Sequence, residues 1–293
     1  MQRLLSELKY HRARRAQPGR AQALLAESLA LVPSNANAAS RWLKTMDPGT
    51  LAGDGATTRA ALLNTLILGL KTLRDQGLAG HGGDLGFETF LAQHAPRSRA
   101  QLFQDLWALY ESGAKRDGFF VEFGATNGVD ISNSYLLETE FGWRGILAEP
   151  NPVWHDALQA NRQVVIETKC VGARTGETLT LHLTDDPEFA STTETRGAAR
   201  SVDVPTISLA DLLDQHNAPD RVDFLSIDTE GSEFDILDAY GFGPDVRPIR
   251  LIAVEHNFEA VKRQRIHDLL TARGYTRRYE VYAQFDDWYA LER

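Results

Sequence analysis

Four short segments of the chain concentrate the residue types that do chemistry, and each ends a predicted strand. The first combines an acid with two glycines, because Glu122 stands two residues before Gly124 and Gly128 follows. Glycine lets a bulky ligand approach the backbone closely. The dinucleotide fingerprint G-x-G-x-x-G needs glycine at its third position, which is Thr126 here. The segment therefore argues against a pyrophosphate cofactor, and Glu122 favours a cationic sulfonium with an amino-acid tail. A simple tight turn is the alternative.

The second segment is Glu149-Pro150-Asn151, some twenty residues past the glycine turn. An acid that ends the second strand of a nucleotide-binding sheet is placed to accept hydrogen bonds from two ribose hydroxyls. The alternative is that Glu149 caps a helix that begins near Pro152. Because the first segment already suggests a nucleoside cofactor, the ribose interpretation is favoured.

The third segment places Asp228, Glu230 and Glu233 within six residues at the end of an apolar strand. Carboxylates confined together repel one another unless they share a proton or a cation. The cluster is therefore a candidate proton acceptor or metal ligand set. For Glu230 and Glu233 the alternative is a favourable place at the positive N-terminus of the next helix.

The fourth segment, Glu255-His256-Asn257, again ends a strand. Carboxylate, imidazole and amide could form a base, its orienter and a substrate anchor, although an isolated Glu-His pair is more often structural. Together with Asp228 and Glu230 these residues could hold Mg²⁺, which prefers hard oxygen ligands. No spacing enforces such a site, so no metal ligand is predicted.

The elements that position these segments alternate between strand and helix from Gly118 onward. This alternation specifies an α/β fold with a mainly parallel sheet and helices on both faces, and ligands then lie outside the carboxyl ends of the strands. The predicted strands are Phe119–Phe123, Gly145–Glu149, Val164–Val171, Thr178–Thr184, Val202–Ile207, Val222–Asp228, Ile249–Glu255, Tyr275–Ala283 and Trp288–Leu291. The predicted helices are Ser134–Glu140, Val153–Asn161, Leu209–His216, Glu233–Tyr240 and Ala260–Arg273.

Residues 1–95 are predicted to form a separate, all-helical region, and residues 96–293 the α/β domain. In the first region, Arg20–Val32 looks like the second helix of a tetratricopeptide repeat, but one repeat is too few for a solenoid. Thr57–Gln76 is predicted as an amphipathic helix, and Ser98–Lys115 as the helix that connects the two regions.

Composition narrows the class of protein. The net charge of −9 over 293 residues argues against a general nucleic-acid binder. The single cysteine, Cys170, is expected to be a small buried hydrophobe. No run approaches the roughly 18 apolar residues that span a bilayer. Arg and His also interrupt the N-terminus before a signal-peptide core could form. These features predict a soluble, cytoplasmic protein.

With these segments in place, the chain from about Ser98 to its C-terminus resembles the FkbM family of S-adenosylmethionine-dependent methyltransferases. Many short fragments match in order along the chain. They are Gln101–Asp105, Phe120–Ala125, Ser132–Glu138, Ala148–Asn151, Trp154-His155, Asn161-Arg162, Cys170-Val171, Thr206–Leu209, Asp223–Glu233, Val254–Asn257, Gly274-Tyr275 and Asp286–Tyr289.

The resemblance implies a class I methyltransferase fold with S-adenosylmethionine as cofactor, and O-methylation of glycan or natural-product hydroxyls. Glu149 would hold the ribose, with Pro150 and Asn151 near the adenine, while Asp228 and Glu230 would face the transferred methyl group. The remaining implied cofactor contacts, mostly to the methionine end, are Glu122, Gly124, Ala125, Asn127, Gly128 and Asn133.

The sequence therefore predicts an O-methyltransferase that acts on a small-molecule or glycan hydroxyl, either as a monomer or as a homo-oligomer. His256 or Asp228 would take the hydroxyl proton, and Glu230 and Glu255 would orient the base or a metal. Two alternatives are an NAD-dependent oxidoreductase, disfavoured by the missing glycine, and a non-catalytic Rossmann-like adaptor. A third is a methyltransferase whose acceptor is a protein side chain.

Overall fold

The computed structural model describes residues 85–183, 200–280 and 282–291, together with residues 9, 11–14, 20 and 24. The chain divides into two compact units, Met1–Trp107 and Ala108–Arg293. The predicted helix Thr57–Gln76 and most of Arg20–Val32 lie outside the described residues. The tetratricopeptide likeness and the boundary at residue 95 therefore stay predictions.

The predicted connecting helix is shorter than the sequence suggests. Helix α5 (Leu85–His94) runs into the 3-10 turn η3 (Ala95–Arg97), and α6 begins only at Gln104 and ends at Glu111. Two side chains at the start of α6 take local partners: Asp105 accepts from the Ser98 hydroxyl at 2.6 Å, and Gln104 accepts from the Leu102 N–H at 2.9 Å. These side-chain bonds compete with helical backbone bonds before residue 104.

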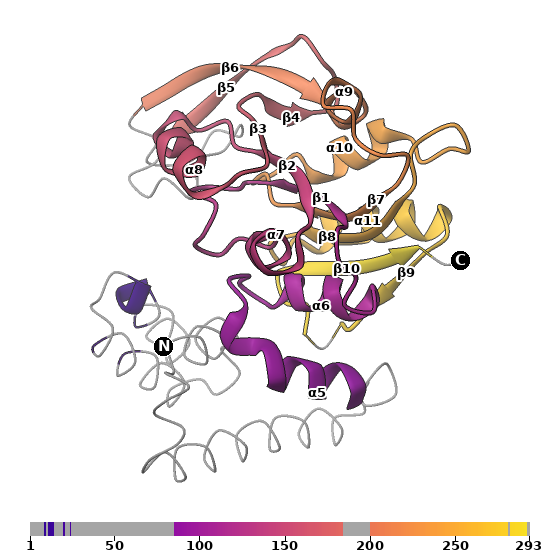
Figure 1. Ribbon diagram of the computed structural model, residues 1–293. Coiled ribbons are helices and arrows are strands. Elements are labelled where there is room, and N and C mark those ends of the chain that lie inside the picture. Colours follow the sequence, from indigo (N-terminus) through magenta and orange to yellow (C-terminus); the bar gives the residue numbers. More distant parts are fainter. Residues whose placement is uncertain are drawn as a thin grey trace. The chain divides into compact units, whose positions relative to one another are not determined.

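The central sheet has seven strands in the order β3-β2-β1-β7-β8-β10-β9 (Figure 1). Every neighbouring pair from β3 to β8 is parallel, whereas β10 runs antiparallel to both β8 and β9. The mainly parallel α/β fold predicted from the sequence is confirmed. In sheet order, the strands are β3 (Val165–Glu167), β2 (Arg144–Ala148), β1 (Phe119–Phe123), β7 (Val222–Ile227), β8 (Ile249–Glu255), β10 (Asp286–Leu291) and β9 (Tyr275–Arg278).

Helices cover both faces of this sheet, with α7 in front of it and α10 and α11 behind it in Figure 1. The face toward α9, α10 and α11 holds the main apolar core, in which Val121 and Leu225 pack with Ile236 and Leu270. Alternate residues of β1, such as Glu122, therefore point to the other face. The helices are α7 (Tyr135–Phe141), α8 (His155–Asn161, after the 3-10 turn η4, Pro152–Trp154), α9 (Leu209–Gln215), α10 (Glu233–Tyr240) and α11 (Ala260–Ala272).

A second, three-stranded sheet has the order β4-β6-β5, with β4 at Cys170–Gly172, β6 at Arg200–Ser208 and β5 at Thr178–Leu183. The single strand predicted at Val164–Val171 is therefore wrong. Its two halves, β3 and β4, belong to different sheets because the Glu167 carboxylate accepts from the Lys169 N–H at 3.0 Å and turns the chain.

The predicted strand Tyr275–Ala283 is also too long, because β9 ends at Arg278. The backbone of Tyr279 has a φ of 51°, and the carbonyl of Tyr279 accepts from the N–H groups of Tyr282 and Ala283. This turn replaces the extended backbone that the alternation predicted.

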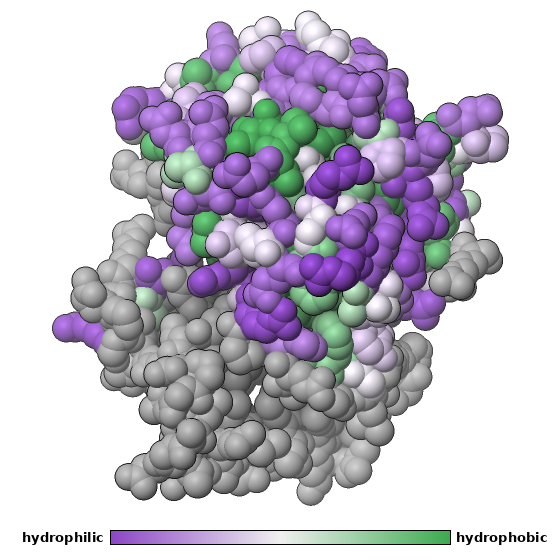
Figure 2. Space-filling model, in the orientation of Figure 1, coloured by the Kyte–Doolittle hydropathy of each residue, from purple (hydrophilic) through white to green (hydrophobic). Residues whose placement is uncertain are grey.

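Most of the described surface in Figure 2 is hydrophilic, with a broad apolar patch in the upper half of this view and smaller apolar areas elsewhere. Among the described residues, no helix has both the length and the apolar character that a membrane crossing requires.

Candidate functional site

A pocket opens at the carboxyl ends of β1, β2 and β7, where the order of the parallel sheet reverses around β1. Such a switch point is the usual ligand site of an open α/β sheet. The pocket encloses about 680 Å³ of empty space, part of it open to solvent. Its lining residues are Phe123, Gly124, Thr126, Ile131, Ala148, Glu149, Pro150, Cys170, Val171, Leu181, Asp228, Thr229 and Glu230.

Gly124 lies where the turns after β1 and β7 touch. Its φ is 75°, and a Cβ atom there would lie 2.3 Å from the carbonyl oxygen of Asp228. No other residue fits such a contact without moving the backbone. The first predicted glycine is therefore required by the close approach of two strand exits, and this approach places Asp228 on the pocket wall.

Glu149 lies on the opposite wall and is only 4% exposed. Its carboxylate accepts from the backbone N–H groups of Thr126 and Asn151, each at 2.8 Å. Burial raises the pKa of Glu149 to about 7, although the two hydrogen bonds lower the pKa and offset part of this effect. The helical turn after β2 is capped instead by Asn151, whose side chain accepts from the Val153 N–H. Glu149 is thus not the helix cap, and a carboxylate oxygen, which has two lone pairs, retains acceptor capacity toward a ligand.

Asp228, Glu230 and Glu255 form one carboxylate cluster at the pocket edge, with oxygen atoms within 4.8 Å of one another. Burial, followed by the charges of Asp228 and Glu230, raises the pKa of Glu255 far above its ordinary value. Glu255 therefore keeps its proton and donates it to Asp228 in a hydrogen bond. Burial and the charge of Glu230 in turn raise the pKa of Asp228 to about 7.

Glu233, the third acid of its segment, stabilises the fold and does not line the pocket. It is fully buried, and one carboxylate oxygen accepts from the N–H groups of Thr229 and Gly231 at 3.1 and 2.9 Å. Its other oxygen pairs with the Lys262 ammonium at 3.1 Å. The helix-terminus interpretation therefore holds for Glu233, whereas Glu230 lines the pocket.

His256 lies away from the pocket and is 1% exposed. Its Nδ1 accepts from the Phe258 N–H at 3.1 Å, which assigns the ring proton to Nε2, facing Asp287 Oδ1 at 3.8 Å. Against the effect of burial, His256 and Arg263 lower the pKa of Asp287 below its ordinary value. His256 is not among the residues that line the pocket.

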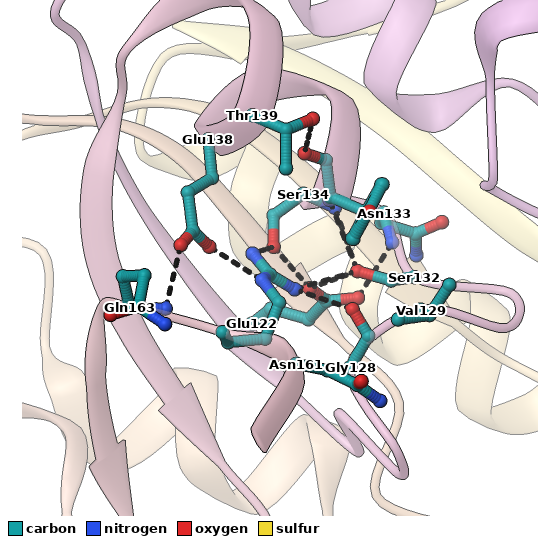
Figure 3. A network of polar contacts seen from close by, with 12 residues as sticks. Glu122, Gly128, Val129, Ser132, Asn133, Ser134, Glu138, Thr139, Asn161 and Gln163 are labelled. Atoms are coloured by element: carbon teal, nitrogen blue, oxygen red, sulfur yellow. Dashed lines mark hydrogen bonds and ion pairs between the residues drawn. The ribbon is translucent and has the colours of Figure 1, made fainter. Parts of the chain in front are cut away.

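Glu122 lies under the pocket rather than in its lining, and is 3% exposed. Its carboxylate accepts from the Asn133 N–H at 2.6 Å and from the hydroxyls of Ser132 and Ser134 (Figure 3). The Arg162 guanidinium joins the same network, donating to Ser132 at 3.1 Å and to Ser134 at 2.9 Å. This carboxylate therefore fastens the 128–134 loop.

The other implied cofactor residues support the loops around the pocket without lining it. Gly128 packs against α8, since a Cβ there would lie 2.6 Å from Leu158 Cδ1. Asn127 Oδ1 accepts from the N–H groups of Val129 and Asp130, each at 2.9 Å. Asn133 donates its amide to Ser226 Oγ on β7 at 2.9 Å. Ala125 and Asn151 are buried at 1% and 2% exposure.

Sequence reasoning missed the apolar wall of the pocket. Cys170 is buried as expected, and burial raises the pKa of its thiol to about 11, yet it also lines the pocket with Val171. Leu181 reaches the wall from β5 of the second sheet, and Ile131 from the loop before α7. Only the residues at strand ends carried a sequence signal; Leu181 and Ile131 carried none.

No curated protein matches the chain. Solved structures that resemble it include a candidate RNA methyltransferase from Pyrococcus horikoshii (12% identity, 64% of this chain and 81% of that one, TM-score 0.36). Another is precorrin-6y C5,15-methyltransferase from Geobacter metallireducens (16% identity, 64% and 87%, TM-score 0.36). A third is the methyltransferase domain of METTL16 (12% identity, 62% and 63%, TM-score 0.35).

The family described as "Methyltransferase FkbM domain" matches residues 122–277, more than half of the chain. The match begins at Glu122 beneath the pocket and contains every residue of the pocket lining and of the carboxylate cluster. By this match the chain belongs to the FkbM methyltransferase family, which implies S-adenosylmethionine as its cofactor.

Proposed function

We propose that this protein is an O-methyltransferase that transfers the methyl group of S-adenosylmethionine to a hydroxyl of a glycan or natural-product-like small molecule. Its family supplies the reaction class. The observation that carries the choice of oxygen is Asp228, a pocket carboxylate whose raised pKa, about 7, suits removal of a hydroxyl proton.

The pocket residues fit this cofactor. Gly124 leaves room at the strand exits for its methionine end, and Glu149 is placed to accept from the ribose hydroxyls. Cys170, Val171 and Leu181 give an apolar wall suited to the adenine ring. When bound, the cofactor supplies a methyl group on a positively charged sulfur.

The three carboxylates of the cluster then have different roles. Asp228 accepts the proton of the acceptor hydroxyl, which strengthens the oxygen as a nucleophile. Glu255 holds its own proton and orients Asp228 through their hydrogen bond. Glu230 is fixed beside them by the Asn257 amide, which spans Glu230 and Glu255 at 3.4 and 2.8 Å. Of the two bases considered from the sequence, we favour Asp228 over the buried His256.

A divalent cation is the other species that three neighbouring carboxylates could hold, because hard oxygen ligands suit Mg²⁺. In that case EDTA would abolish turnover and added Mg²⁺ would restore it. If a shared proton satisfies the cluster, as proposed here, EDTA leaves turnover unchanged.

The test of the proposed base is Asp228→Asn, which removes the proton acceptor but keeps the shape of the side chain. Transfer of tritiated methyl groups to a panel of glycosides and phenols should fall about 10²–10⁴-fold. The Kd for S-adenosylhomocysteine, measured by calorimetry, should change little. Asp238→Asn, on the exposed face of α10, is the matched control. Equal loss of turnover and affinity would move Asp228 into the cofactor site.

Ligand binding separates the remaining alternatives. S-adenosylhomocysteine should raise the melting temperature of the wild-type protein, and Glu149→Ala should reduce that increase. Stabilisation by NAD instead would favour an oxidoreductase, and stabilisation by neither would favour the non-catalytic adaptor.

A further inference from the structure

We propose that Ile131 is an apolar wall of the cofactor pocket that strengthens ligand binding, and that Arg162 is the positioning residue that holds it in a left-handed backbone conformation. This inference rests on the proposed function, because it takes the pocket as the S-adenosylmethionine site.

Ile131 combines two features that rarely coincide in one residue. It lines the pocket, and its φ is 55°. A β-branched side chain in the left-handed region is a genuine conformational outlier. Two other lining residues, Thr126 and Glu230, also have positive φ values, 46° and 57°. Strained backbone of this kind gathers at ligand sites and persists only where the surroundings enforce it.

The chain on both sides of Ile131 is held by a single guanidinium group. Arg162 Nη1 donates to the Gly128 carbonyl at 2.9 Å and to Ser132 Oγ at 3.1 Å. Ser132 also donates to Glu122 at 3.0 Å (Figure 3). The loop is thus fastened three residues before Ile131 and one residue after it.

Arg162 makes a set of hydrogen bonds that a lysine side chain could not make. Its side chain is fully buried, its Nε pairs with Glu138, and its Nη2 donates to Ser134 Oγ. A planar fork of five donors satisfies these partners together, whereas an ammonium group offers a single point of attachment. Arg162 itself does not line the pocket, so any effect on the ligand must pass through the loop.

This arrangement predicts opposite effects on stability and binding at Ile131. Asparagine tolerates the left-handed region but lacks the apolar surface of isoleucine. Ile131→Asn should therefore keep or raise the midpoint of thermal unfolding, while the Kd for S-adenosylhomocysteine rises about 5–20-fold from lost apolar contact. Val153→Asn, at a β-branched residue that is 60% exposed, is the control and should leave the Kd unchanged. A parallel fall of midpoint and affinity in Ile131→Asn would mean that the residue is only structural.

A double-mutant cycle tests the role of Arg162. Arg162→Lys should weaken S-adenosylhomocysteine binding in the wild-type background, and this effect should largely disappear when residue 131 is already asparagine. If Arg162→Lys does not fold, Ser134→Ala removes one hydroxyl between Arg162 and Glu122 and takes its place in the cycle. Additive effects on Kd would overturn the proposal.

Binding by the wild-type protein separates failure of the proposed function from failure of the roles given to Ile131 and Arg162. If the wild-type protein does not bind S-adenosylhomocysteine, the proposed function is wrong. If the wild type binds and Ile131→Asn binds equally well, only the inference about Ile131 and Arg162 is wrong.

Discussion

Several carboxylates gather at and near the candidate site, and the partners of each decide what it can do. Glu122 and Glu233 accept hydrogen bonds from neighbouring loops, so they hold those loops in place. Glu149 is held by two backbone N–H groups but still lines the pocket. Asp228 and Glu255 share a proton instead, because burial and mutual repulsion disfavour two charges side by side.

The shared proton makes stability depend on pH. The folded state raises the pKa of Glu255, so the folded state binds this proton more tightly than the unfolded state does. Its stabilising contribution is complete below the unfolded pKa and is lost as pH rises toward the folded value. Glu255→Gln mimics the protonated acid. The variant should match the wild type near about pH 4 and lose less stability than the wild type up to about pH 9. Thermal unfolding across that range checks this, and parallel profiles would contradict it.

At the scale of elements, the site depends on two strand exits that meet. Strand β1 pairs with β7 although about a hundred residues separate them, and the turns that follow both strands touch at Gly124. The second sheet supplies the third side through Leu181. The pocket therefore exists only when the parallel pairing and the second sheet are both in place.

Gly124→Ala tests the meeting of the two exits. The added methyl group meets the Asp228 carbonyl and the backbone must keep a positive φ, so a loss of about 2–4 kcal/mol in unfolding free energy is expected. Gly113→Ala is the matched control, since its φ is 68° but nothing lies within 4 Å of the new Cβ. It should cost only about 1–2 kcal/mol. Urea unfolding measures both variants, and equal losses would show that the contact is unimportant.

At the scale of the whole molecule, charge limits the class of acceptor. The net charge is −9, and a general nucleic-acid binder needs a cationic surface to displace phosphate counterions. We therefore expect that the protein does not retard single-stranded RNA in a gel at about 0.15 M salt. The negative net charge does not repel an uncharged glycoside acceptor. Submicromolar RNA binding would contradict the proposed acceptor class.

The division of the chain into a helical region and an α/β domain at residue 95 stays a prediction. The sequence predicts a helical region over residues 1–95, of which the structure describes only a few residues and the C-terminal helix α5. The candidate site lies wholly within Ala108–Arg293.

The sequence by itself determined the elements whose signals are local. Phe119–Phe123, Glu233–Tyr240 and Ile249–Glu255 were predicted with the bounds that the structure has, because periodicity and flanking residues specify them. It also identified the acids at the strand ends, since an acid directly after an apolar strand stands out in the chain.

Tertiary structure decided which of those acids line the pocket. Glu122 and Glu149 look alike in the sequence, yet only Glu149 lines the pocket, because Ser132, Asn133 and Ser134 take up the Glu122 carboxylate. The split of residues 164–171 between two sheets and the place of Leu181 were also settled by pairing between distant segments. Such contacts depend on side chains that are far apart in the sequence, which no local pattern can specify.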